Sequence, residues 1–261
     1  MNIDDLFDAY LVDLDGVVYV GEEAVAGVPS AIAALRRRGK PILFLTNDPR
    51  GARADFAAKL TRLGVPATAD DVLTSTAATA AYIAERHDVA GRTVFAIGTY
   101  AFKSELANVG LRVLEGYAGR AADFVVLGCY EGFNYWEVLV AGQAARRGAY
   151  LYATNRDPVF PMPDGLWPAT GVVVAAVEAA AGKTAVAVGK PEVPMFAVAK
   201  KMLPAAARLA IVGDRLDSDI LGGKRAGIGT ILVLSGGTSA AEAASADIQP
   251  DFVLPSLAGL V

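Results

Sequence analysis

YLVDLDG, the stretch at residues 10–16, places three apolar side chains directly before two aspartates and a glycine. An uninterrupted apolar run that leads toward a glycine is typical of a strand buried on both faces of a parallel sheet. Three later apolar runs have a similar form, and they lead into Thr46, Lys190 and Asp214. Because ligands gather beyond the carboxyl ends of parallel strands, we expect the polar side chains at these four strand ends to meet at one site.

Helical patterns separate the strand-like runs along the chain. This alternation favours an α/β fold with a parallel sheet. A second block, residues 85–183, contains three further strand-like runs but none of the four polar strand ends. The sequence therefore predicts a doubly wound, Rossmann-like parallel-sheet core of residues 1–84 and 184–261, with an α/β domain of residues 85–183 inserted in it.

Composition and charge argue against several kinds of partner. The chain has 24 basic and 28 acidic residues and no long basic tract, so we expect no nucleic acid partner. An acidic amino terminus without an apolar signal core, and the lack of a long uncharged apolar run, predict a cytoplasmic protein that does not enter a membrane. Cys129 is the only cysteine, and we expect it to be a small buried apolar side chain.

Asp13 and Asp15 are suited to phosphoryl chemistry in two steps. The two residues would share a face of a regular strand, but Gly16 lets the chain turn and present them differently. A carboxylate can attack a phosphoryl group and form an aspartyl-phosphate, which water later cleaves. A second carboxyl group can protonate the leaving oxygen and then activate that water.

The acids expected at the site would repel one another without a cation. They are Asp13, Asp15, Asp214, Asp217 and Asp219. Magnesium prefers such oxygen ligands and can also bind a phosphate oxygen, so the sequence predicts Mg²⁺ as the cofactor. We expect the Thr46 hydroxyl, the Asn47 backbone amide and the Lys190 ammonium to contact the phosphoryl oxygens.

Four segments resemble, in order, the four motifs of the haloacid dehalogenase superfamily. They are DLDGVVY at residues 13–19, LTN at residues 45–47, VGKP at residues 188–191 and GDRLDSD at residues 213–219. The chain is most similar to the subclass IIA phosphatases, which include NagD-like and p-nitrophenyl phosphatase-like enzymes, and the similarity covers essentially its whole length. Residues 153–158 resemble a stretch of the inserted α/β cap domain of that subclass.

This resemblance implies roles for the acids. Asp13 would be the nucleophile and Asp15 the general acid and base. Magnesium would be held by Asp13, by the backbone carbonyl of Asp15 and by Asp214, while Asp219 would orient a metal-bound water. An acid at position 15 also argues against dehalogenase activity, because dehalogenases of the superfamily lack it.

Thr46 and Lys190 are expected to assist catalysis, and both are expected to bind the substrate together with Asn47, Asn155 and Asp157. The resulting prediction is a magnesium-dependent hydrolase that cleaves phosphate monoesters of small phosphorylated metabolites. We expect the cap to close over the site and select the substrate, and we expect a homo-oligomer to form through the cap. The sequence leaves several phosphate esters open, among them sugar phosphates, glycerol phosphate and pyridoxal phosphate.

Other functions share parts of this pattern. A phosphotransferase or mutase would use the same aspartyl-phosphate, and trapping with alcohols in place of water would separate these activities. A phosphate-binding protein without activity would keep the fold, but the intact set of acids argues against it. An NAD-binding Rossmann protein would need a G-x-G-x-x-G motif, which does not follow the first strand.

Several charged residues are assigned no part in the chemistry. His87, the only histidine, lies in a charged stretch and is expected on a solvated surface. The basic cluster of Arg36–Arg38 and Lys40 is expected to be a solvated helix end, and Asp217 is expected only to favour a helix dipole. Asp48 stands where many members of the subclass have a neutral residue, which would place a further negative charge near the phosphate.

Overall fold

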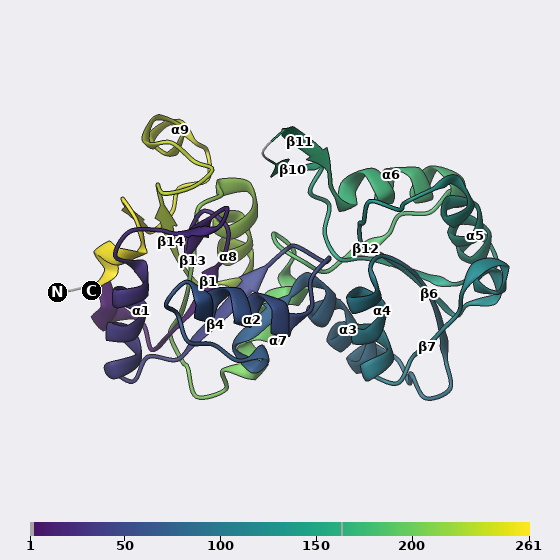
Figure 1. The fold of residues 1–261 in the computed structure, drawn as a ribbon, viewed down its shortest axis with the longest axis horizontal. Coiled ribbons are helices and arrows are strands. Elements are labelled where there is room, and N and C mark those ends of the chain that lie inside the picture. Colours follow the sequence, from purple (N-terminus) through teal and green to yellow (C-terminus); the bar gives the residue numbers. More distant parts are fainter. Residues whose placement is uncertain (1–2, 163) are drawn as a thin grey trace. The chain divides into compact units, whose positions relative to one another are not determined.

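The computed structural model describes residues 3–162 and 164–261, which fold into two compact units (Figure 1). Unit 1 consists of Met1–Thr46, Arg53–Leu73 and Lys190–Val261. Unit 2 consists of Asn47–Ala52 and Thr74–Gly189. Each unit has its own sheet and its own hydrophobic core, which confirms the predicted α/β class.

The sheet of unit 1 has six strands in the order β15-β14-β13-β1-β4-β5. They are β1 (Ala9–Asp13), β4 (Ile42–Thr46), β5 (Val72–Thr74), β13 (Leu209–Gly213), β14 (Gly229–Val233) and β15 (Phe252–Leu254). The ladders from β15 through to β4 are all parallel. Every residue of β1, β4 and β13 is buried, as the uninterrupted apolar runs predict for strands covered on both faces.

Short helices and one hairpin complete unit 1. The helices are α1 (Val28–Arg37), α2 (Arg53–Arg62), α7 (Val193–Met202), α8 (Leu221–Ala226) and α9 (Ala240–Ser245), and the hairpin pairs β2 (Tyr19–Val20) with β3 (Glu23–Ala24). Single turns are η1 (Ile3–Leu6), η2 (Ala69–Asp71), the π-helical η4 (Leu216–Ile220) and η5 (Leu257–Leu260). Helix α1 buries Ile32 and Leu35 in the same core cluster as Phe44 of β4. Burial of these apolar side chains stabilises the layered packing.

Unit 2 contains a five-stranded sheet in the order β12-β9-β8-β6-β7 and a separate hairpin, β10-β11. Its strands are β6 (Thr93–Ile97), β7 (Arg112–Val113), β8 (Phe124–Leu127), β9 (Tyr150–Ala153), β10 (Val159–Met162), β11 (Gly165–Pro168) and β12 (Val186–Ala187). Its helices are α3 (Ser75–Arg86), α4 (Tyr100–Asn108), α5 (Tyr135–Arg146), α6 (Thr170–Ala181) and the 3₁₀ segment η3 (Gly116–Ala121). Cys129 is buried in the core of this unit, as expected.

One strand pairs in a different sheet from the predicted one. The sequence assigns the apolar run before Lys190 to the first sheet, but β12 pairs with β9, with Val186 opposite Tyr152 and Ala187 opposite Ala153. The pairing continues beyond β12, because the Gly189 amide donates to the Thr154 carbonyl at 2.7 Å. The prediction of a buried strand is also wrong here, because β12 lies at the edge of its sheet and Val186 is 47% exposed. The apolar run does not specify which strand satisfies its backbone groups.

The division into units also differs from the predicted boundaries. Residues 1–84 were expected in the core, whereas α3 and the loop Asn47–Ala52 belong to unit 2. At the other end, unit 2 extends to Gly189 and therefore includes β12. Helix α3 packs against α4, and β12 pairs with β9, so both elements lie with unit 2.

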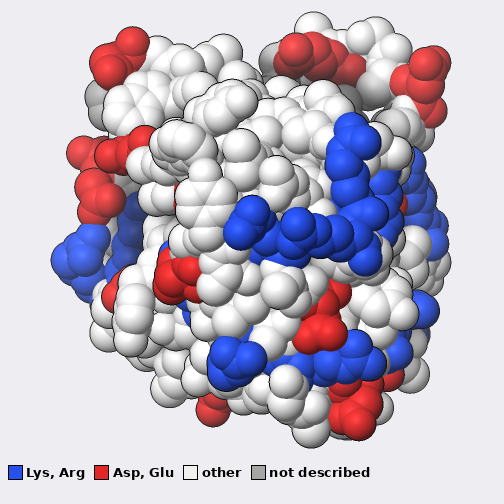
Figure 2. Space-filling model, turned by 90° about the vertical axis from the view of Figure 1, so that its right-hand side faces the viewer, with Lys and Arg blue, Asp and Glu red and all other residues white. Residues whose placement is uncertain are grey.

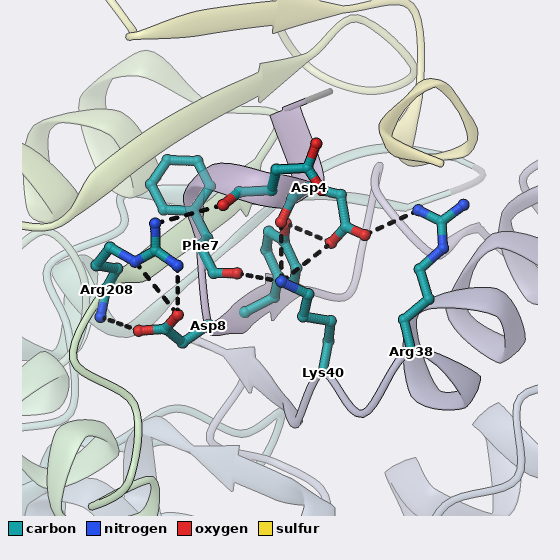
Figure 3. Close-up of polar contacts among 8 residues, drawn as sticks. Asp4, Phe7, Asp8, Arg38, Lys40 and Arg208 are labelled. Carbon is teal, nitrogen blue, oxygen red and sulfur yellow. Dashed lines mark hydrogen bonds and ion pairs between the residues drawn. The ribbon is translucent and has the colours of Figure 1, made fainter. Parts of the chain in front are cut away.

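Two residues of the basic cluster form ion pairs with a buried acid (Figure 3). Asp4 is 2% exposed and accepts hydrogen bonds from Arg38 Nη1 at 2.8 Å and from the Tyr10 hydroxyl at 3.0 Å. Lys40 Nζ donates to the carbonyls of Asp4 at 2.9 Å and Phe7 at 2.6 Å. Arg38 is exposed, as expected of a solvated helix end, whereas Lys40 is partly buried beside Asp4, an acid that lies in a distant part of the sequence.

The surface carries charges of both signs. Figure 2 shows one face of the molecule, on which basic and acidic side chains are interspersed with uncharged ones. Among the described residues, no helix combines the length and the apolar character that a membrane crossing requires.

Candidate active site

The register of the unit 1 sheet brings three of the predicted site residues to one edge. Strand β1 lies between β13 and β4, with Val12 opposite Val212 and Asp13 opposite Leu45. Thr46 and Asp214 therefore lie one position beyond the level of Asp13 on the neighbouring strands. All three side chains are buried at the carboxyl edge of the sheet.

Lys190 joins two of the acids. Its Nζ donates to Asp13 Oδ1 at 2.5 Å and to Asp219 Oδ1 at 2.7 Å, and the lysine is only 3% exposed. Burial opposes the charged form, but the Asp13 and Asp219 carboxylates outweigh it and raise the pKa of Lys190. The ammonium group therefore remains charged inside the protein.

Asp219 is held in place by the turn η4. Its Oδ2 accepts a hydrogen bond from the Arg215 amide at 3.1 Å, and its residue is fully buried. Gly213 is required beside it, because a Cβ atom at position 213 would collide with the Asp219 carboxyl group. The glycine that ends β13 thus makes room for this acid.

Asp214 has one oxygen satisfied and one without a partner. Its Oδ2 accepts from the Gly237 amide at 2.6 Å, while the buried Oδ1 has no hydrogen bond partner within the described part of the chain. Gly16, which has a φ of 78°, and Gly236 both approach this carboxylate so closely that a Cβ atom at either position would collide with it. A buried carboxylate oxygen without a partner is costly, so it indicates a missing ligand.

The cluster carries more negative than positive charge. Ligand oxygens of Asp13, Asp214 and Asp219 all lie within 4.8 Å of one another, and Lys190 is the ammonium group bonded to two of them. Burial, with the Asp219 carboxylate, raises the pKa of Asp214 to about 6. Burial also raises the pKa of Asp13 well above its ordinary value, against the effect of Lys190. A divalent cation with a preference for oxygen ligands fits this set of acids.

Asp15 and Asp217 are exposed to solvent, unlike the buried acids of this cluster. Asp15 is exposed in the turn after β1, where the Gly16 amide donates to the Tyr19 carbonyl at 2.8 Å. The exposed Asp217 carboxylate accepts two hydrogen bonds from the Arg215 guanidinium, each 3.1 Å long. Asp217 therefore has a local surface partner.

Three predicted substrate-binding residues meet within unit 2. Asn47 Nδ2 donates to Asp157 Oδ2 at 2.8 Å, and Asn155 Nδ2 donates to the Asn47 carbonyl at 2.7 Å. Ser75 Oγ donates to the same carbonyl at 2.7 Å. Ser75 could not be predicted as a partner of Asn47, because its only local signal is its position at the start of α3.

Asp48 is neutralised by a nearby arginine that the sequence analysis also missed. Arg50 binds the Asp48 carboxylate through Nε at 2.9 Å and Nη2 at 2.8 Å. The Arg50 guanidinium also lies 4.0 Å from the centre of the Phe160 ring in β10, which is cation–π geometry. The expected additional negative charge of Asp48 is therefore balanced within its own loop.

His87 is partly buried within an aromatic cluster. Its Nε2 and the Tyr152 hydroxyl are 2.8 Å apart, and its ring lies 4.3 Å from the ring of Tyr150. Burial, together with Arg92 and Arg86, lowers the pKa of His87. The charged neighbours in the sequence concealed the aromatic side chains that the fold brings to it.

Comparisons with known proteins agree with this geometry. The model of the haloacid dehalogenase-like hydrolases matches residues 10–112, and a second HAD-hydrolase-like model matches residues 187–260. An acid sugar phosphatase of Staphylococcus epidermidis is 33% identical over 252 residues, which cover 96% of this chain and 95% of that protein. Chronophin of Mus musculus is 37% identical over 267 residues, which cover 96% of this chain and 91% of that protein.

Solved structures show the same relationship. The crystal structure of a glycerol phosphate phosphatase from Mycobacterium tuberculosis in complex with magnesium matches with a TM-score of 0.92 and 34% identity, over 100% of this chain and 78% of that chain. The resemblance of the four sequence motifs is thereby confirmed. The chain belongs to the haloacid dehalogenase-like hydrolases and, within that superfamily, to subfamily IIA.

Proposed function

We propose that this protein is a magnesium-dependent phosphatase that hydrolyses phosphate monoesters of small metabolites. The observation that carries the proposal is the buried Asp13 carboxylate at the end of β1, bonded to Lys190 and close to Asp214 and Asp219. The acid sugar phosphatase and glycerol phosphate phosphatase relatives support this reaction class. Their names also support a small phosphorylated metabolite as the substrate.

Asp13 is the proposed nucleophile. Its oxygen attacks phosphorus, an aspartyl-phosphate forms and the ester P–O bond breaks. A nucleophilic carboxylate must be ionised, but burial favours the protonated form of Asp13. The Lys190 ammonium opposes this effect through its hydrogen bond to Oδ1, so Lys190 keeps Asp13 charged and fixes its orientation.

Asp15 is the proposed proton carrier. In the first step its carboxyl group gives a proton to the leaving oxygen, and in the second it removes a proton from the water that attacks the aspartyl-phosphate. The second attack breaks the bond between phosphorus and Asp13 and releases inorganic phosphate. The exposure of Asp15 after β1 is consistent with a group that exchanges protons with water.

The proposed metal ligands are Asp13, Asp214 and the backbone carbonyl of Asp15, with Asp219 orienting a water. The unpaired Asp214 Oδ1 and the three clustered carboxylates fit a magnesium ion. When bound, magnesium would offset the charge of the acids and of the phosphoryl oxygens. The Thr46 hydroxyl, the Asn47 amide and Lys190 are the proposed phosphate donors.

A phosphate-release assay across a panel of phosphorylated metabolites tests this proposal. We expect magnesium-dependent release that chelation abolishes and that Asp13→Asn lowers by about a thousandfold or more. Asp217→Asn is the matched control, because it removes an exposed carboxylate that is bonded to Arg215. Full turnover by Asp13→Asn would overturn the nucleophile assignment.

Phosphoryl transfer to a small alcohol is the alternative for the second step. The same aspartyl-phosphate would react with an acceptor hydroxyl group in place of water. Adding glycerol or ethylene glycol to the assay separates the two reactions. Hydrolysis is supported if, at every concentration of the added alcohol, the released phosphate equals the alcohol released from the substrate ester. Transfer is supported if the added alcohol becomes phosphorylated and is the main product.

We also propose self-association through unit 2. Four aromatic side chains in the described part of unit 2 have more than half of their area exposed: Tyr100, Tyr117, Tyr135 and Trp136. Such side chains are enriched at protein interfaces. Light scattering of the wild type and of Trp136→Ser tests the proposal, and a wild-type monomer at all concentrations contradicts it.

A further inference from the structure

Asn47 is held at three points by other residues of unit 2. Its backbone carbonyl accepts hydrogen bonds from Ser75 Oγ and Asn155 Nδ2, each 2.7 Å long, and its side-chain Nδ2 donates to Asp157 Oδ2 at 2.8 Å. A carbonyl oxygen has two lone pairs, and both are used here. The main chain and the side chain of this residue are therefore fixed together.

Asn155 and Asp157 are themselves fixed by the start of α6. The Asp157 amide donates to Asn155 Oδ1 at 3.0 Å, and the Gly171 amide donates to the Asp157 carbonyl at 2.8 Å. A Cβ atom at position 171 would lie 2.8 Å from that carbonyl oxygen, so glycine permits this close approach. Asn155 is only 2% exposed, and both polar atoms of its amide are used inside the protein.

The residue before Lys190 packs against the same group. A Cβ atom at Gly189 would lie 2.7 Å from Asn47 Oδ1 and would collide with the Thr154 carbonyl. The Gly189 amide donates to that carbonyl at 2.7 Å. Asn47 follows Thr46 in the chain and Gly189 precedes Lys190, so this hydrogen-bonded group adjoins both residues that are proposed to bind phosphate.

We propose that Asn155 and Asp157 are positioning residues that fix the Thr46–Asn47 peptide group, and that they do not act by contacting the substrate. This inference rests on the proposed function, in which the Asn47 amide binds the phosphate. It replaces the expectation that both residues bind the substrate. Because every substrate carries the same phosphate group, loss of either residue lowers catalysis by the same factor for all esters.

Hydrogen exchange of the segment 45–52 tests whether the two residues hold this loop. We expect Asp157→Ala and Asn155→Ala to raise its exchange rate by about tenfold or more, because each loses a hydrogen bond to Asn47. Asp157→Asn keeps an acceptor oxygen and restores slow exchange. Asp88→Ala, which removes an exposed carboxylate elsewhere in unit 2, is the control. Wild-type exchange in both alanine variants overturns the inference.

Kinetics then distinguish positioning from substrate contact. With p-nitrophenyl phosphate and glycerol 3-phosphate, we expect Asp157→Ala to lower kcat/KM by the same factor, about tenfold. Because Asp157 acts through the Asn47 side chain, Asn47→Ala combined with Asp157→Ala loses no more than the more affected single variant. Losses that differ between the two esters, or that multiply in the double variant, contradict the inference.

The two proposals fail in different ways. If the wild type releases no phosphate from any ester, the proposed function fails, whereas the exchange experiment still decides whether Asn155 and Asp157 hold Asn47. If the wild type is active but the alanine variants exchange and react as the wild type does, only the positioning role fails.

Discussion

Two clusters of charged residues in the described part of unit 1 surround buried acids, one at the carboxyl edge and one at the amino edge of the sheet. The carboxyl-edge cluster consists of Asp13, Lys190, Asp214 and Asp219. The amino-edge cluster consists of Asp4, Tyr10, Arg38 and Lys40 (Figure 3). The first has three carboxylates and one ammonium group, and the second has one carboxylate and two cations. Similar residues therefore produce opposite charge balances in one unit.

The difference shows what a binding site requires. At the amino edge, the buried acid has nearby cations and a hydroxyl donor, so the cluster ties η1 to the strands that follow it. At the carboxyl edge, Asp214 Oδ1 has no hydrogen bond partner among the described residues, and the pKa values of Asp13 and Asp214 are raised. Unbalanced charge lowers the stability of the metal-free protein, but it creates affinity for a cation.

Removing the one ammonium from the carboxyl-edge cluster should have the largest effect on stability. We expect Lys190→Met to lower the free energy of unfolding of the metal-free protein by about 3–5 kcal/mol, because Asp13 and Asp219 are left buried without their cation. Phosphate release should also be lost. Urea unfolding in a chelator measures the change, with the exposed Lys201→Met as the control. An unchanged midpoint of urea unfolding would show that the Lys190 ammonium does not stabilise the buried carboxylates.

Removing the acid from the amino-edge cluster should affect stability alone. We expect Asp4→Ala to lower the free energy of unfolding by about 2–3 kcal/mol, because the buried Tyr10 hydroxyl loses its acceptor and Lys40 and Arg38 lose their counter-charge. The value of kcat/KM should stay within about twofold of the wild type. The exposed neighbour Asp5→Ala is the control. A selective loss of activity would contradict a purely structural role.

The two edges should also respond differently to acid. The pKa of Asp214 is raised to about 6, so the folded protein binds this proton more tightly than the unfolded chain does. Its contribution to stability is present at low pH and is lost as the pH rises through about 6. In a chelator, the wild type should therefore gain about 1 kcal/mol relative to Asp214→Asn between pH 7 and pH 5. Parallel pH curves for the two proteins would refute this assignment.

The smallest effect should come from the exposed ion pair beside the amino-edge cluster. The Arg208 guanidinium lowers the pKa of Asp8, and its Nη2 lies 2.7 Å from Asp8 Oδ1 (Figure 3). The stabilisation is present above the ordinary pKa of Asp8 and is lost on acidification, which is opposite in sign to that of Asp214. We expect Arg208→Ala to lower the melting temperature less than Asp4→Ala does, and salt should remove the difference. A larger change than that of Asp4→Ala would reverse this ranking.

The strand ends that bring Asp13, Thr46 and Asp214 together could be predicted from the sequence, because strand ends are local features. β1, β4 and β13 each show five consecutive buried residues, and their last positions follow directly from the apolar runs. Two edge strands, β5 and β15, were not predicted, because a run of only three residues is too short to distinguish a strand from a loop or a helix. The apolar runs thus predict burial correctly for β1, β4 and β13 but not for the edge strand β12, and short edge strands depend on the neighbour they pair with.

Partners that are distant in sequence could not be predicted. Nothing near Asn155 and Asp157 indicates that their polar groups bind Asn47, because the hydrogen bonds span more than a hundred residues. The aromatic environment of His87 depends in the same way on Tyr150 and Tyr152 of β9. The types of these residues were readable from the sequence, but their neighbours required the fold.

The pairing of β12 with β9 defines where chimeric enzymes should be joined. A graft that exchanges only residues 85–183 between relatives would separate β9 from β12 and the 155–157 segment from Asn47. An intact unit 2 would instead be transferred if the chains were joined at 46/47, 52/53, 73/74 and 189/190. Recombination between relatives therefore requires that both segments of unit 2, which lie before and after α2 in the chain, come from the same parent protein.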